Sequence, residues 1–101
     1  MNGYEQVERL IDLLRRLYEE SAGFHDAPDN PQLWYNRGYA NGMVGVLDGA
    51  GYGCRLREQL DPDPEDIIDG QQTTPWGRAY RHGLEMGEQE CREVLPQKEP
   101  V

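Results

Sequence analysis

Residues 31–49 have the sequence PQLWYNRGYANGMVGVLDG. Asn30 followed by Pro31 is typical of a helix start, because asparagine caps helix N-termini and proline fits the first turn. Glycines stand at positions 38, 42, 45 and 49, and these spacings of four, three and four place them on one face of a helix. Each glycine costs about 0.5–1 kcal/mol relative to alanine. The stripe therefore indicates a face that another backbone approaches closely, unless the glycines break the helix.

The same pattern recurs farther along the chain. Residues 35–43 and 76–84 share the order aromatic, Arg, small, Tyr, polar, Gly, apolar. We predict that the two segments form helices that pack against each other, with Tyr39 and Tyr80 beside the contact. The residues expected in this packing are all glycines, namely Gly38, Gly42, Gly45, Gly83 and Gly87.

The rest of the chain supplies a third helix and a loop. After Asn2, which can cap a helix, apolar residues recur at spacings of three and four, as in an amphipathic helix. Thr74 and Pro75 repeat the cap-plus-proline signal before the last helix. We predict an all-α three-helix bundle with helices at about 3–22, 31–49 and 75–95, and a long acidic loop carrying a short helical turn. Residues 1–95 would form one domain, and residues 96–101 a disordered tail.

The charge of the chain restricts the classes of partner. Nineteen acidic residues against ten basic ones give 101 residues a net charge of −9. Direct nucleic-acid binding is not expected, because that affinity comes mainly from cations that neutralise phosphates. No stretch is long and apolar enough for a membrane span, so we expect a soluble protein of the cytoplasm. A partner with a basic surface fits this charge best.

No set of residues predicts catalysis or metal binding. His25 and His82 lack a second ligand at i+4, and Cys54 and Cys91 lack the spacing of a zinc site. The acidic loop lacks the glycine and the final glutamate of an EF-hand. We therefore expect no enzyme activity, no cofactor and no metal.

Two groups of residues are candidates for contact with a partner. The acidic loop contains Asp61, Asp63, Glu65 and Asp66, and carboxylates along an extended segment can imitate phosphates. The second group is the pair of tryptophans Trp34 and Trp76. These side chains could instead belong to the core, and the sequence leaves this open.

The segment WYNRGYANGM at 34–43 resembles the Arg-Gly-Tyr-x-x-Gly helices of small, acidic, uncharacterised bacteriophage proteins, particularly those of actinobacterial hosts. The resemblance covers about a tenth of the chain. It implies a phage-encoded helical protein that binds a host protein and inhibits or redirects it. A DNA mimic that occupies a defence nuclease or a regulator is the sharper form of this hypothesis. The alternative is a structural homodimer whose two copies pack through the glycine stripe.

Overall fold

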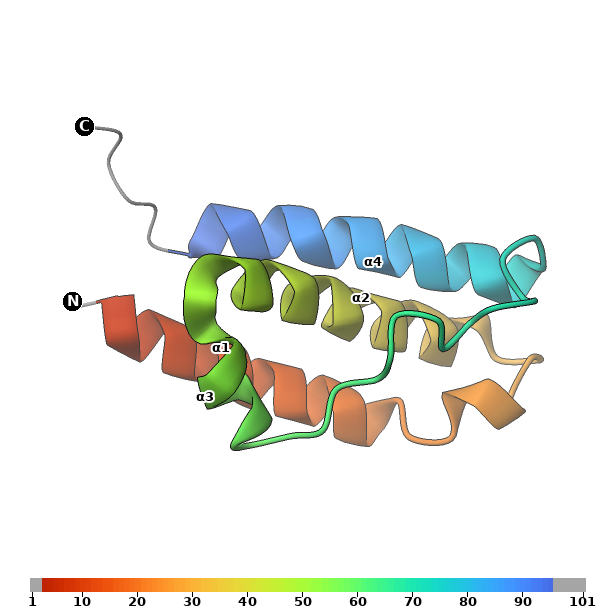
Figure 1. Cartoon of the computed structure of the whole chain (residues 1–101). Coiled ribbons are helices and arrows are strands. Elements are labelled where there is room, and N and C mark those ends of the chain that lie inside the picture. The colour runs from red at the N-terminus through yellow and green to blue at the C-terminus, as the bar shows by residue number, and fades with distance from the viewer. Residues whose placement is uncertain (1–2, 96–101) are drawn as a thin grey trace.

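The computed structural model describes residues 3–95, and within this range it is all-helical, as predicted. The long helices are α1 (Gly3–Glu20), α2 (Pro31–Leu47) and α4 (Pro75–Val94) (Figure 1). Shorter pieces are the 3-10 turn η1 (Phe24–Asp26), the kinked segment η2 (Asp48–Tyr52) and the helix α3 (Gly53–Arg57). Each long helix ends one or two residues before the predicted end. The expected tail at 96–101 lies outside the described residues.

The helix starts follow the sequence signals to different degrees. Thr74 caps α4, because its Oγ1 accepts a hydrogen bond from the Gly77 N–H at 2.9 Å. Asn30 precedes Pro31 at the start of α2, but its side chain makes no capping bond. Proline alone therefore marks this second start, where it lacks the N–H that would need a partner.

Helix α2 is the central element and runs parallel to α4 (Figure 1). It packs between α4 and α1, which runs in the opposite direction. Apolar side chains from α1, α2, α3 and the end of α4 form the main core: Val7, Leu10, Ile11, Leu14, Ala40, Met43, Leu47, Leu56, Cys91 and Leu95. The burial of one face of α1 is what its apolar spacing predicts.

Glycines bring the backbones of α2 and α4 together. A Cβ built on Gly38 would lie 2.0 Å from the carbonyl oxygen of Tyr80, and one on Gly42 would lie 2.2 Å from that of Leu84. The reverse contacts come from α4, where Cβ atoms on Gly83 and Gly87 would each lie 2.1 Å from a carbonyl oxygen of α2. Any side chain at these four positions would push the helices apart. We call this contact the glycine seam.

Gly45 does not belong to the glycine seam, contrary to the expectation from its spacing. A Cβ at this position would meet no heavy atom within 4 Å, because Gly45 is exposed. The helix also continues through Gly38, Gly42 and Gly45, so these glycines do not break it. The break comes later, at Gly51, whose φ of 97° lies in the left-handed region that favours glycine.

The segment 58–74, which we call the strap, returns the chain along α2 to the start of α4 (Figure 1). It contains no helix. The short turn predicted there takes the form of successive tight turns, in which Ile67 and Asp69 donate to the carbonyls of Pro64 and Asp66. Ile68 of the strap is buried in a second apolar cluster with Phe24, Trp34 and Tyr80.

Alanine substitutions at Gly42, in the glycine seam, and at the exposed Gly45 should have opposite effects on stability. We expect Gly42→Ala to destabilise the protein by about 1–3 kcal/mol, because the new methyl group overpacks a backbone contact. Gly45→Ala should stabilise it by about 0.5–1 kcal/mol, because alanine favours the helix and meets only open space there. Urea unfolding of both variants measures the difference. Equal effects would contradict the glycine seam.

Candidate functional site

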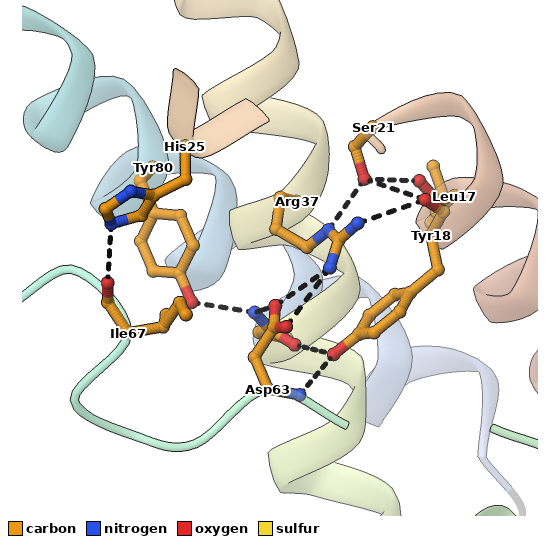
Figure 2. A network of polar contacts seen from close by, with 9 residues as sticks. Leu17, Tyr18, Ser21, His25, Arg37, Asp63, Ile67 and Tyr80 are labelled. Carbon is orange, nitrogen blue, oxygen red and sulfur yellow. Dashed lines mark hydrogen bonds and ion pairs between the residues drawn. The ribbon is translucent and has the colours of Figure 1, made fainter. Parts of the chain in front are cut away.

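The most buried charge of the described chain is the guanidinium of Arg37, which joins α1, α2 and the strap (Figure 2). Its Nη1 donates to both carboxylate oxygens of Asp63, at 3.0 and 3.2 Å. Its Nε donates to Ser21 Oγ at 2.8 Å, and its Nη2 donates to the carbonyl of Tyr18 at 3.1 Å. The guanidinium carbon also lies 4.1 Å from the centre of the Tyr18 ring, a cation–π distance.

Asn41 extends this arrangement to α4. Its Nδ2 donates to Asp63 Oδ2 at 2.9 Å and to the hydroxyl of Tyr80 at 2.8 Å. The Tyr18 hydroxyl donates to Asn41 Oδ1 and accepts from the backbone N–H of Asp63. We call the linked residues Arg37, Asp63, Tyr18, Asn41, Ser21 and Tyr80 the clasp. Among the described residues no buried side-chain nitrogen or oxygen lacks a hydrogen-bond partner.

The clasp changes the role expected for Asp63. Its side chain is 16% exposed and accepts bonds from Arg37 and Asn41, so it is a structural residue and not part of a free acidic surface. The strap is fixed to the helices at this residue.

Burial also affects the two tyrosines of the clasp. Burial of the Tyr18 ring raises the pKa of its hydroxyl to about 12. Burial raises the pKa of the Tyr80 hydroxyl as well, although the bond from Asn41 opposes the shift. Both phenols are therefore held in the neutral form.

A groove of about 510 Å³ lies where the strap passes α2 and α4. A second hollow of about 350 Å³ adjoins it and shares Glu65, Tyr80, Leu84 and Glu88. We call the two together the acidic groove. Its first part is lined by Asn41, Gly42, Val44, Gly45, Asp48, Arg57, Asp61, Pro62, Asp63, Pro64, Glu65, Tyr80, Leu84 and Glu88.

Carboxylates outnumber cations in the acidic groove. Besides the clasp residue Asp63, the lining carboxylates are Asp48, Asp61, Glu65, Asp69, Glu85 and Glu88, whereas its cations are Arg57 and Arg81. The structure thus brings Asp61 and Glu65 together at one site. Asp66 is exposed but lines neither part of the groove.

The two tryptophans lie outside this site. Trp34 is 1% exposed, and its Nε1 donates to the carbonyl of Ala27 at 3.0 Å, so it is a core residue and not a surface anchor. Trp76 is half-buried beside it, with ring centres 6.5 Å apart, and donates to Gln71 Oε1 at 2.8 Å. This hydrogen bond links the start of α4 to the end of the strap.

Sequence reasoning missed three charged lining residues: Asp48, Arg57 and Arg81. A partial signal was available, because Asp48 follows Val44 and Glu88 follows Leu84 at i+4, on the same helix faces. That these faces meet under the strap depends on the parallel course of α2 and α4, which the periodicity does not specify.

The histidines and cysteines are dispersed. His25 Nε2 donates to the carbonyl of Ile67 at 3.1 Å, whereas His82 packs edge-on against Tyr35. Burial raises the pKa of the Cys91 thiol to about 11, and Cys54 is exposed. Within residues 3–95 no three His, Cys, Asp or Glu side chains are placed to hold a metal ion.

Comparison of the whole chain with protein-family models, with curated proteins and with solved structures found no match. Within residues 3–95 no helix combines the length and the apolar content that a membrane crossing requires.

Removal of the clasp carboxylate should destabilise the fold. We expect Asp63→Ala to lower the free energy of unfolding by about 3–5 kcal/mol, because it leaves the Arg37 guanidinium buried without its counter-ion. Asp66→Ala is the matched control in the same strap, and it should change stability by no more than about 0.5 kcal/mol. Urea unfolding followed by circular dichroism compares the two. Similar small effects would show that the clasp contributes little.

The clasp tyrosines predict the response to alkali. A phenol with a raised pKa in the folded state stabilises the fold fully below its ordinary pKa of about 10, and this stabilisation is lost as the pH rises toward the folded value. We expect the free energy of unfolding to fall between about pH 10 and 12, and to fall less steeply in Tyr18→Phe. Chemical unfolding across this range tests it. A flat profile would exclude the effect.

Proposed function

We propose that this protein is a non-enzymatic binding protein that recognises a partner with a basic surface through the acidic groove. The observation that carries the proposal is the gathering of carboxylates from η2, α4 and the strap around one concave site. Concave sites with a few charged groups are the usual places of recognition. The net charge of −9 adds long-range attraction for a cationic partner.

The apolar residues that line the groove favour contact with a partner over hydration by water alone. Val44, Leu84 and Tyr80 provide apolar surface between the carboxylates, and Gly45 leaves the α2 backbone uncovered. A partner segment can therefore exclude water from part of the contact, which strengthens the charged pairs. Asp61 and Glu65 belong to an exposed part of the strap, and no ion pair involves either of them within the described residues.

The resemblance to phage proteins suggests what kind of partner this is. We propose a host protein in the bacterial cytoplasm that is inhibited or redirected. A nuclease or a regulator whose DNA-binding surface is basic would fit carboxylates that imitate phosphates. In that case double-stranded DNA should compete with this protein for the partner.

The homodimer alternative cannot use Gly38 and Gly42 as its contact in this structure. The face of α2 that carries Gly38 and Gly42 is covered by α4 of the same chain. These glycines are therefore not available to a second copy.

A charge-matched pair of variants tests the proposed function. The groove variant carries Asp61→Asn, Glu65→Gln, Glu85→Gln and Glu88→Gln, and leaves Asp63 in place. The control carries Glu19→Gln, Glu20→Gln, Asp26→Asn and Asp29→Asn, four exposed residues away from the groove. Both variants lose four negative charges, so their net charge is the same and the lost charges lie at different places.

A partner captured from host lysate by the parent protein is then measured with all three proteins. We expect the association rate of the groove variant to fall about tenfold at 0.1 M salt, and that of the control to fall much less. Raising the salt to 1 M should slow the parent, because the Debye length drops from about 10 Å to about 3 Å. Equal association rates for the two variants would refute the groove as the binding site.

A further inference from the structure

The acidic groove already contains one cation from this chain. Of the residues that line its larger part, Arg57 alone is basic. Its Nη1 donates to Asp48 Oδ1 at 3.3 Å and its Nη2 donates to Asp48 Oδ2 at 3.5 Å. This two-pronged contact is the geometry with which arginine recognises a carboxylate.

Two glycines, Gly51 and Gly53, allow the chain to place Arg57 beside the groove. Gly51, with φ 97°, turns the chain between α2 and α3. A Cβ on Gly53 would lie 2.2 Å from Asp48 Oδ1 and 2.7 Å from Arg57 Nη1, so the missing side chain makes room for the pair. The turn at Gly51 and the missing side chain at Gly53 therefore both allow the Arg57–Asp48 contact.

The pair itself is weak. The side chains of Arg57 and Asp48 are 53% and 49% exposed, whereas those of Arg37 and Asp63 in the clasp are 10% and 16% exposed. Exposed pairs with long bonds add little to stability, because water competes for both groups. Replacement of Arg57 by another cation at Asp48 therefore costs little free energy. The same is not true of Arg37 at Asp63.

We infer that in the free protein Arg57 occupies the position on Asp48 that an arginine side chain of the partner takes in the complex. The inference rests on the proposed function and names the chemistry of the bound segment: an arginine-bearing peptide stretch with apolar neighbours. Its guanidinium replaces that of Arg57 on Asp48, and its aliphatic stem covers Val44 and Leu84. A planar guanidinium matches the two oxygens of Asp48, whereas a lysine ammonium makes a point contact. Arg57 then acts as an internal competitor that lowers the affinity of the free groove.

The test uses a defined probe. A fluorescent, acetylated and amidated nonapeptide of three Arg-Leu-Gly units is titrated into the full-length protein at low salt, beside its lysine counterpart. The variants are Arg57→Gln and, as the control, Arg16→Gln. Arg16 lies on α1, pairs with Asp12 at 2.9 Å and has no contact with the groove, so both variants lose one positive charge from an exposed ion pair.

We expect Arg57→Gln to bind the arginine peptide about fivefold more tightly than the parent, as removal of a unit charge about 4 Å away in water predicts. Arg16→Gln should stay within about twofold, because a distant exposed charge is screened. The arginine peptide should bind the parent more tightly than the lysine peptide. Thermal melting of each variant confirms that the fold is retained.

Three results would overturn the inference. These are unchanged or weaker binding by Arg57→Gln, the same gain in Arg16→Gln, and no binding of the arginine peptide to either protein. The proposed function fails separately, if the groove variant and its charge-matched control associate equally with the captured host partner. Groove-dependent capture with no effect of Arg57→Gln would remove this inference and leave the proposed function standing.

Discussion

The contact of two helix backbones without side chains between them is the constraint on which the rest of the structure depends. At Gly38, Gly42, Gly83 and Gly87 any Cβ would collide with a carbonyl oxygen of the facing helix. The pairs occur in the same order along both helices, so α2 and α4 run parallel. A parallel pair cannot be joined by a tight turn, because the chain must first travel back along the length of α2. That length is about 25 Å for its 17 residues. The long connection between these helices follows directly from the glycine seam.

The returning segment must be fixed, since its sequence is too polar and too rich in proline to form a helix of its own. Asp63 fixes it by accepting bonds from Arg37 and Asn41 of α2, while its backbone N–H donates to Tyr18 of α1. Farther along, Ile68 enters the second apolar cluster and His25 holds the carbonyl of Ile67. The acidic groove lies beside these attachment points, where the strap passes α2 and α4. Asp63 attaches the strap to the helices, whereas its neighbours Asp61 and Glu65 are exposed and line the groove.

The sequence predicts the helices well, because their signals are local: a proline at the start of α2 and of α4, periodic apolar residues on α1, and glycines at helical spacing on α2. It predicts the acidic character of the site and two of its rim residues for the same reason. It does not predict which of several acids pairs with Arg37, because that choice depends on the path of the strap across α2. Trp34 could not be assigned to the core, since burial depends on Phe24, Ile68 and Tyr80 from three distant segments. Gly45 has the spacing of the glycine seam, but α4 does not pass over it.

The parallel course of α2 and α4 also bears on the order in which the molecule forms. Contacts across the glycine seam join residues separated by more than forty positions, such as Gly38 and Tyr80, whereas α1 and α2 are joined by a connection of ten residues at 21–30. Closing a longer loop loses more chain entropy before any contact compensates it. Loop closure therefore favours contact between the antiparallel helices α1 and α2 over contact between α2 and α4 early in folding. Until α4 packs against it, α2 carries several glycines without the packing that offsets their low helix propensity. The helical form of α2 thus depends on tertiary packing more than on the intrinsic helix preference of its residues.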